Sequence, residues 1–350
     1  MNQNFQVALV ADLLGPDGQV VFQDFGVDLL ADIGIPYRYI EEDLRPVIPD
    51  QIRDYDVVIS MGQPYVPTSF EGVKRLSLIA RTGVGYDMVD LDAATEAEVM
   101  VTITPEATKK PVASATLALM LGLCHRIRIK DAIVRENNWP SRFNHMGCEI
   151  RDRVIGLIGL GQIGQEVVRL LKAFEPAEIL ASDPVVTDEE AAKIGVRLVD
   201  KDTLLRQSDF VSIHCPLNTH THKLMSEQEF RIMKSSAFLI NTARGPIVDQ
   251  TALTKALLEG WIQGAAIDVF EQEPIDPSDP LLSLENIILA PHASAWTYEL
   301  FRDIGHDCIK ATMAVARGEV PPYVVNKAVL ERPGLKNKLR RYKEIWENQQ

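Results

Sequence analysis

The chain has 350 residues, of which 46% are hydrophobic and 24% are charged, and its formal net charge at pH 7 is −13. These proportions are ordinary for a globular protein, and the length leaves room for two domains with separate cores. Nucleic acids are polyanions, so a chain this acidic is a poor match for them and we expect no nucleic-acid partner.

Signals for targeting, disulfides and metal binding are weak. The four cysteines are far apart and form no C-x-x-C pair, which argues against a disulfide framework or a zinc site and favours small core residues. No basic segment precedes the short apolar run near the N-terminus, and the longest apolar stretch, residues 111–124, is too short to cross a bilayer. We therefore expect a cytoplasmic protein with no metal and no membrane partner. The cysteines are Cys124, Cys148, Cys215 and Cys308.

The first 104 residues alternate short apolar runs with helical patterns, which predicts a parallel α/β sheet. Helices are expected at residues 25–33, closed by Gly34, and at residues 91–98. The predicted strands cover residues 6–10, 37–40, 57–60, 78–81 and 99–103.

A glycine-containing loop, R-T-G-V-G-Y-D, starts at the last residue of the strand predicted at 78–81. Ligands of open α/β sheets bind at the carboxyl ends of the strands, so the N–H groups of Val84 and Gly85 could hold a carboxylate. An ordinary glycine turn would have the same sequence.

Residues 111–128 predict a long helix with almost no charge before His125. We expect this helix to be buried on most sides and to carry the chain from one sheet to the next. Residues 137–149 are polar and irregular, and we expect a loop that wraps a neighbouring surface.

The most informative stretch is residues 153–183. An apolar run at 154–158 leads directly into G-L-G-Q-I-G at 159–164, and the stripe of an amphipathic helix follows. A second short strand is predicted at 179–181. This order of strand, glycine turn, helix and strand is that of a dinucleotide-binding unit.

Each residue type in this unit suits a bound NAD. Gly159 can take up the tight turn, Gly161 lets a pyrophosphate reach the N–H groups at the helix N-terminus, and Gly164 lets the helix pack on the strand. The Asp183 carboxylate could accept hydrogen bonds from the ribose hydroxyls and would repel a 2′-phosphate, so NAD is favoured over NADP. Followed by Pro184, Asp183 could instead simply end the strand.

Four more apolar runs follow, which makes six strands in a doubly wound Rossmann sheet. Ser226 and Glu229 have the spacing of a capping box, and Asp249 is the predicted N-cap for the helix at 253–258. The four predicted strands cover residues 210–215, 237–241, 265–270 and 287–290.

Arg244, Glu273 and His292 follow three of these strands and should therefore meet at one edge of the sheet. The Arg244 guanidinium could hold the carboxylate of a 2-keto acid and polarise its keto oxygen. His292 could donate a proton to that oxygen, and Glu273 could stabilise the imidazolium. Alone, such an Arg is usually in a surface ion pair and such a His is often structural, so the joint placement carries the prediction.

At these residues the chain resembles the D-isomer-specific 2-hydroxyacid dehydrogenase family, over about two thirds of its length. The resemblance implies that Arg244, Glu273 and His292 are the catalytic set and that Asp268 contacts the nicotinamide carboxamide. It also implies reductase or dehydrogenase activity on a small 2-keto or 2-hydroxy acid, as in glyoxylate/hydroxypyruvate reductases or phosphoglycerate dehydrogenases. The motifs that carry the resemblance lie at residues 81–87, 156–164, 214–221, 241–249, 268–274 and 291–294.

The resemblance further implies a domain arrangement and a cofactor site. Residues 109–299 would form the NAD-binding Rossmann domain, and residues 1–108 with 300–330 a smaller flavodoxin-like substrate domain, with the active site in the cleft between them. A second interdomain helix is expected near 295–317, and a homodimer through the nucleotide-binding domain. The expected cofactor contacts are Gly159, Gly161, Gln162, Ile163, Gly164, Asp183, His214, Cys215, Pro216, Thr221, Thr242, Ala243, Asp268 and His292.

The chain departs from the family pattern in places. Ser114 stands where many members have an acidic residue, and Trp296 where a smaller or different side chain is usual, so Trp296 could narrow the cleft and change substrate choice. Residues 331–350 form a tail with a helical stripe that we expect to dock on the protein. The stripe consists of Leu335, Leu339, Tyr342 and Trp346.

Two other functions are compatible with parts of the pattern. A non-catalytic NAD-binding scaffold, like the corepressors that share this fold, could keep Arg244, Glu273 and His292. A formate dehydrogenase would pair its histidine with glutamine, so Glu273 speaks against it. Residues 61–65 could line a substrate pocket, but they do not identify the substrate.

Overall fold

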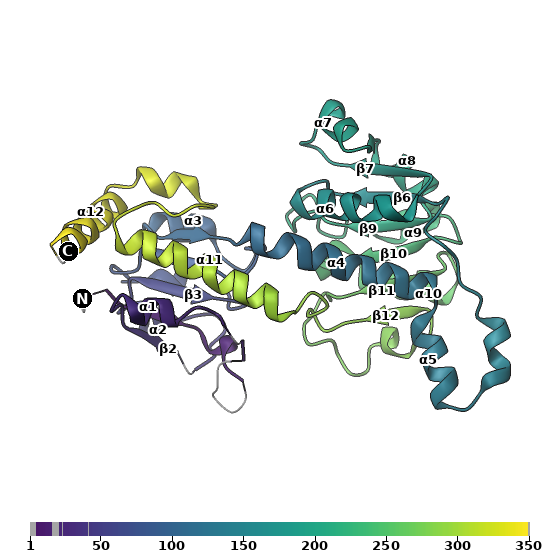
Figure 1. Cartoon of the computed structure of the whole chain (residues 1–350), viewed down its shortest axis with the longest axis horizontal. Coiled ribbons are helices and arrows are strands. Elements are labelled where there is room, and N and C mark those ends of the chain that lie inside the picture. The colour runs from purple at the N-terminus through teal and green to yellow at the C-terminus, as the bar shows by residue number, and fades with distance from the viewer. Residues whose placement is uncertain (1–4, 16–20, 23, 41, 349–350) are drawn as a thin grey trace. The chain divides into compact units, whose positions relative to one another are not determined.

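The computed structural model describes residues 5–15, 21–22, 24–40 and 42–348. Residues 1–4, where a targeting signal would begin, and residues 349–350 of the predicted tail lie outside the described residues. The chain divides into two compact units, Met1–Thr108 with Trp296–Gln350, and Lys109–Ala295 (Figure 1). The second boundary falls before Trp296 instead of at 299/300, and the tail belongs to the first unit instead of forming a separate extension.

The first unit contains a five-stranded parallel sheet with the strand order β2-β1-β3-β4-β5. This is the flavodoxin-like order, as predicted. The residues of β1, β3 and β4 are all buried, which is typical of a parallel sheet covered on both faces. The strands are β1 (Val7–Leu9), β2 (Tyr37–Tyr39), β3 (Val57–Ser60), β4 (Leu78–Arg81) and β5 (Met100–Thr102).

The longest helix of this unit, α11 (Tyr298–Ala316), is held closely against the sheet and its neighbours. A Cβ added at Gly305 would overlap the backbone of Phe25, and the Cys308 thiol lies 3.6 Å from the carbonyl oxygen of Arg81. Gly34 has a φ of +69° and closes α1 as predicted. The other helices are α1 (Asp28–Asp32), α2 (Pro49–Ile52) and α3 (Leu91–Glu96), with short 3₁₀ turns η1 (Ala11–Leu13), η2 (Pro67–Phe70) and η7 (Lys327–Glu331).

The predicted tail helix is α12 (Pro333–Glu347), and it docks on the first unit through the expected stripe. Leu335, Leu339 and Tyr342 are buried. The Tyr342 hydroxyl donates to Asp56 over 2.7 Å, and its ring meets Phe5 edge-on with 5.1 Å between centroids. The tail is therefore part of this unit's core.

The second unit contains a seven-stranded parallel sheet with the order β12-β11-β10-β9-β6-β7-β8. The doubly wound Rossmann topology was predicted, but the count of six strands was wrong because β8 has only two residues and no periodicity to detect. The strand order reverses between β6 and β9, where such sheets bind ligands. The strands are β6 (Val154–Ile158), β7 (Glu178–Ser182), β8 (Arg197–Leu198), β9 (Phe210–Ile213), β10 (Phe238–Asn241), β11 (Gly264–Ile267) and β12 (Ile287–Leu289).

Apolar layers cover both faces of this sheet. Phe210 and Ile240 pack with α4 (Pro105–Cys124) and α6 on one face, while Val211 and Leu239 pack with α8, α9 and α10 on the other (Figure 1). The capping predictions are confirmed, since Ser226 N–H donates to Glu229 and Ala252 N–H to Asp249. The other helices are α6 (Gln162–Leu171), α7 (Asp188–Lys193), α8 (Lys201–Gln207), α9 (Glu227–Ile232) and α10 (Gln250–Leu258), with 3₁₀ turns η4 (Lys172–Phe174), η5 (Gly245–Ile247) and η6 (Pro280–Ser283).

The single helix predicted at 111–128 is wrong at both ends. Helix α4 (Pro105–Cys124) starts earlier, and Arg126 takes a left-handed conformation with φ 51° that ends it before α5 (Ile127–Arg135) begins. The irregular segment that follows contains the 3₁₀ turn η3 (Trp139–Asn144). No single helix in the described ranges is long and apolar enough to cross a membrane; only α4 and α5 joined across their 59° bend reach that length and composition.

Candidate active site

The three fingerprint glycines have distinct surroundings. Gly159 has a φ of +97°, and a Cβ there would lie 2.7 Å from the amide nitrogen of Cys215. A Cβ at Gly164 would lie 2.6 Å from the carbonyl oxygen of Gly159, so α6 packs directly on the turn. By contrast, a Cβ at Gly161 would meet no atom within 4 Å. Two of the glycines thus permit close packing, and the third opens the N-terminus of the helix.

The start of α6 is suited to an anion. Gly161 is its N-cap and supplies no side-chain hydrogen bond, so the first N–H groups, from Gln162 and Ile163 onward, have no side-chain cap. Unpaired N–H groups and the helix dipole both favour negative charge at this position. The residues at this helix start therefore fit the diphosphate of a dinucleotide.

Asp183 contacts this loop directly. Its carboxylate accepts hydrogen bonds from the N–H groups of Leu160 at 2.7 Å, Val185 at 2.8 Å and Val186 at 3.1 Å. Burial alone would raise the pKa of Asp183, but these three donors outweigh it and the net pKa is lowered. A negative charge therefore stands beside the glycine loop at neutral pH.

After β9, His214 and Cys215 form a wall beside the glycine turn. The His214 ring nitrogen Nε2 lies 2.9 Å from the Ser212 hydroxyl, and burial lowers the pKa of His214 to about 4. Burial also raises the pKa of Cys215 to about 11. Both side chains are thus neutral at pH 7 and are unsuited to proton transfer. The chain after Cys215 forms a turn in which the Thr221 hydroxyl donates to the carbonyl of Pro216 over 2.6 Å.

After β10, the buried Asn241 shapes the turn that carries Arg244. Its side-chain amide donates to the Arg244 carbonyl over 2.9 Å, and its oxygen accepts from the Ala243 N–H at 3.0 Å. A Cβ at Gly245 would overlap the Phe270 backbone, so this turn lies directly against the segment after β11. Thr242 follows Asn241 in this turn, and its hydroxyl lies 3.0 Å from the Thr116 hydroxyl of α4.

After β11, the buried Asp268 holds the segment that contains His292. Its carbonyl accepts from the His292 N–H at 2.7 Å. Its carboxylate accepts from the N–H groups of Ala293 and Ser294, both at 3.1 Å, and from the Ser294 hydroxyl at 2.6 Å. Asp268 therefore positions the residues after β12, a role that the sequence analysis missed.

Glu273 and His292 form a hydrogen-bonded pair at this edge of the sheet. The His292 nitrogen Nδ1 lies 2.7 Å from one carboxylate oxygen of Glu273, and the other oxygen accepts from the Phe270 N–H at 2.9 Å. Partial burial would raise the pKa of Glu273, but the hydrogen bonds and the nearby charges of His292 and Arg244 lower it overall. The His292 side chain is 48% exposed, so the ring is reachable from solvent.

The family model for the NAD-binding domain of D-isomer specific 2-hydroxyacid dehydrogenases matches residues 117–294, which include the glycine loop, Asp183 and all four strand ends described above. The chain belongs to this family. It is accordingly an NAD(H)-binding oxidoreductase that acts on 2-hydroxy or 2-keto acids.

Several known proteins are similar to this dehydrogenase. It is 38% identical over 313 residues to a glyoxylate reductase of Korarchaeum cryptofilum, covering 88% of this chain and 92% of the relative. It is 36% identical over 321 residues to a D-3-phosphoglycerate dehydrogenase of Methanocaldococcus jannaschii, covering 91% of this chain and 59% of that protein. The crystal structure of D-lactate dehydrogenase with NAD⁺ from Lactobacillus jensenii superposes with a TM-score of 0.74 at 26% identity, covering 92% and 99% of the two chains.

In the first unit of the dehydrogenase, the Val84–Gly85 loop is held by a buried arginine. The Arg81 side chain donates to the Gly85 carbonyl through Nη2 at 2.8 Å and Nε at 3.2 Å. The N–H groups of Val84 and Gly85 make no hydrogen bond within the described part of the chain. Arg81 was not recognised from the sequence as a positioning residue, although a charged residue that ends a buried strand is the signal for one.

The two departures from the family pattern have ordinary surroundings. Ser114 is exposed on α4. Trp296 is half-exposed and packs edge-on against Phe22 and Phe301 of its own unit, with centroids 5.7 and 5.1 Å apart.

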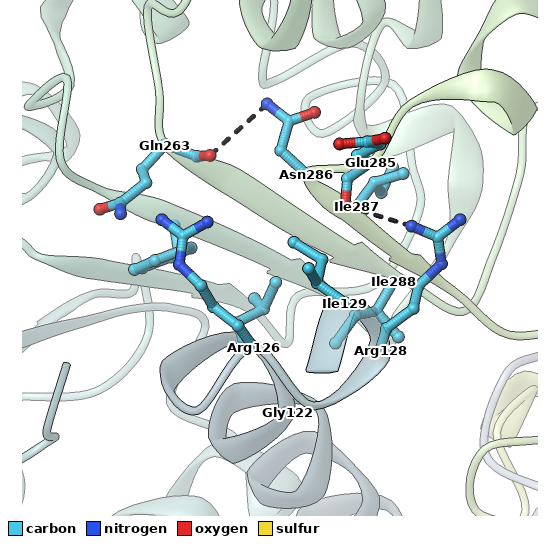
Figure 2. A pocket seen from close by; sticks show the side chains of 11 residues that line it. Gly122, Arg126, Arg128, Ile129, Gln263, Glu285, Asn286, Ile287 and Ile288 are labelled. Carbon is cyan, nitrogen blue, oxygen red and sulfur yellow. Dashed lines mark hydrogen bonds between the residues drawn. The ribbon is translucent and has the colours of Figure 1, made fainter. Parts of the chain in front are cut away.

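A separate pocket lies at the opposite edge of the second sheet, at the amino ends of the strands (Figure 2). Arg126 and Arg128 stand on either side of Ile129 and Ile288, and Arg128 donates to the carbonyl of Glu285 over 3.2 Å. The catalytic candidates lie after the carboxyl ends of the strands, so this pocket is not the NAD site.

Proposed function

We propose that the dehydrogenase interconverts a small 2-keto acid and the D-2-hydroxy acid, with His292 as general acid and base. The observation that carries this proposal is the 2.7 Å contact between His292 Nδ1 and the Glu273 carboxylate beside the NAD-binding edge of the sheet. When Nδ1 is engaged by Glu273, the other ring nitrogen, Nε2, is left for substrate.

Each polar group then has a defined task. Bound NADH supplies the hydride that the keto carbon receives. His292 donates the proton to the keto oxygen during reduction and takes it back during oxidation. Glu273 holds the ring and balances the imidazolium charge, while the Arg244 guanidinium binds the substrate carboxylate and polarises the carbonyl.

We further propose that Val84 and Gly85 bind the substrate carboxylate through their N–H groups. Arg81 pins this loop through the Gly85 carbonyl, so the two donors are fixed before substrate arrives. Preorganised donors of this kind bind an anion without an ordering cost.

Glyoxylate is the substrate to test first, since the Korarchaeum cryptofilum relative is a glyoxylate reductase. The experiment is a panel of glyoxylate, hydroxypyruvate, pyruvate and bulkier 2-keto acids, each with NADH and with NADPH. Turnover of a small member with NADH supports the proposal. Absence of turnover on every member, with NADH still bound, would instead indicate an NAD-binding scaffold.

We propose that NAD(H) is preferred over NADP(H) because the ionised Asp183 would repel a 2′-phosphate. Replacing Asp183 with asparagine should lower the ratio of kcat/KM for NADH over NADPH by roughly tenfold or more, since the charge is lost while an acceptor for the Leu160 N–H remains. Steady-state kinetics with both cofactors measure this ratio. An unchanged ratio would mean that another group selects the cofactor.

We also propose a homodimer through the nucleotide-binding unit, mediated by the α5–η3 arm (residues 127–146). Phe143 and Met146 are 72% and 76% exposed, and such apolar exposure is typical of an interaction surface. Other apolar side chains that are at least half-exposed on this arm are Ile127, Val134 and Trp139.

The double variant Phe143→Ser, Met146→Ser should shift the protein from dimer to monomer, as measured by light scattering after size exclusion. The matched control is Leu258→Ser, which removes an exposed apolar side chain from α10 of the same unit. A double variant that stays dimeric would place the interface elsewhere.

A further inference from the structure

Cys124 and Cys148 meet at the base of the α5–η3 arm. Cys124 is the last residue of α4, and the N–H of Cys148 donates to its carbonyl over 2.9 Å. With standard bond lengths, this contact keeps the two Cα atoms within about 7 Å of each other, near the span that a disulfide needs.

The chain is shaped to keep these residues together. A Cβ at Gly147 would overlap the Cys124 carbonyl, so only glycine lets the returning segment lie this close to the end of α4. On the other side, Arg126 Nε donates to the Met146 carbonyl over 2.9 Å. Both cysteines are free thiols in this structure.

The two thiols differ in reactivity. The neighbouring Cys124 thiol and the charges of Arg153 and Arg126 lower the pKa of Cys148, and the Cys148 side chain is partly exposed whereas Cys124 is buried. The same contact, together with burial, raises the pKa of Cys124. Since the thiolate is the nucleophile, Cys148 is the residue that would react first.

We propose that Cys124 and Cys148 are a reversible thiol modification site that forms an intramolecular disulfide by exchange with a low-molecular-weight disulfide such as glutathione disulfide. The Cys148 thiolate attacks one sulfur of glutathione disulfide, which forms a mixed disulfide and releases one glutathione thiolate. Cys124 then loses its proton and attacks the Cys148 sulfur, which releases the second glutathione. The protein loses two electrons and two protons, and glutathione disulfide is reduced to two glutathione molecules.

The disulfide would close the arm at its base. The chain leaves α4 at Cys124, runs through α5 and η3, and returns at Cys148, so the new bond makes this excursion a covalent loop. Closing a loop restricts its unfolded conformations, and we expect the oxidised arm to open less often.

The primary test is peptide mapping of the intact protein after treatment with glutathione disulfide, followed by alkylation without reduction. The expected result is a Cys124–Cys148 linked peptide that dithiothreitol removes, with Cys215 and Cys308 still alkylated after denaturation. If both thiols remain free, or if Cys148 stops at the mixed disulfide with glutathione, the proposal is overturned.

Two variants test the order of reaction. With Cys124→Ala, Cys148 should be trapped as the mixed disulfide, whereas with Cys148→Ala, Cys124 should stay unmodified. The control Cys308→Ala removes a free cysteine of the other unit and should form the disulfide as wild type does. Limited proteolysis within the arm should be slowed about tenfold or more by oxidation in wild type and Cys308→Ala alone. Equal slowing in Cys148→Ala would show that the disulfide is not its cause.

Discussion

Replacing His292 with glutamine should lower kcat for 2-keto acid reduction by a factor on the order of 10² or more and leave the Kd of NADH nearly unchanged. Glutamine can hydrogen-bond the keto oxygen but cannot deliver a proton at neutral pH. The residues proposed to bind the cofactor are held by other contacts, since Asp183 holds the glycine loop and Asp268 holds the segment after β12. Steady-state kinetics and a titration of NADH fluorescence measure the two quantities.

A backbone effect has to be separated from the loss of the acid, because His292 has a left-handed φ of 54°. Asparagine tolerates this conformation better than glutamine does, so His292→Asn is the matched control. Both variants should lose turnover to a similar extent. A variant that retains turnover would remove His292 from the mechanism.

Glu273→Gln should lower kcat less than His292→Gln does, and it should shift the pH dependence of 2-keto acid reduction. An imidazolium without a carboxylate partner gives up its proton more easily, so the alkaline limb of the pH profile for reduction should move to lower pH. In the wild type, the pKa of Glu273 is lowered by folding from its ordinary value of 4.5. The stability that ionised Glu273 contributes is therefore fully present above pH 4.5. It is lost as the pH falls through the lower pKa that Glu273 has in the folded protein. An unshifted alkaline limb would contradict the pairing.

The sequence alone predicted those parts of the molecule whose structure depends on local residue patterns. The apolar runs of β3, β4 and β6 were predicted to the residue. The glycine spacing located the start of α6, because a helix that must approach a phosphate needs glycine at fixed positions. The strand ends placed Glu273 and His292 at one edge, and the structure shows them 2.7 Å apart.

Features that depend on contacts between distant residues could not be predicted in this way. Asp268 contacts residues beyond the next strand, and Arg81 is recognisable as a positioning residue only once its hydrogen bonds to Gly85 are seen. The cysteines were interpreted as unrelated core residues, yet Cys124 and Cys148 are neighbours because the chain returns to the end of α4. Similarly, the left-handed Arg126 that separates α4 from α5 has no sequence signal.

Arg244→Gln should lower kcat/KM for the 2-keto acid by a factor on the order of 10² to 10³ and leave NADH affinity nearly unchanged. Glutamine removes the positive charge and the forked donors, so the substrate carboxylate loses its partner and the carbonyl is less polarised. The turn itself should persist, because Asn241 holds it through the backbone of Ala243 and the carbonyl of residue 244.

Arg244→Lys separates the effect of the positive charge from that of the paired N–H donors of the guanidinium. Lysine keeps a positive charge but cannot make two parallel hydrogen bonds to a carboxylate, so it should recover only part of the activity lost in Arg244→Gln. If Arg244 holds the substrate carboxylate, KM for the keto acid should rise in both variants and more in the glutamine variant. If KM stays at the wild-type value in both while kcat falls, Arg244 acts on Glu273 and not on the substrate, since its charge also lowers the pKa of that carboxyl. The division of the loss between KM and kcat therefore decides which partner of Arg244 matters for catalysis.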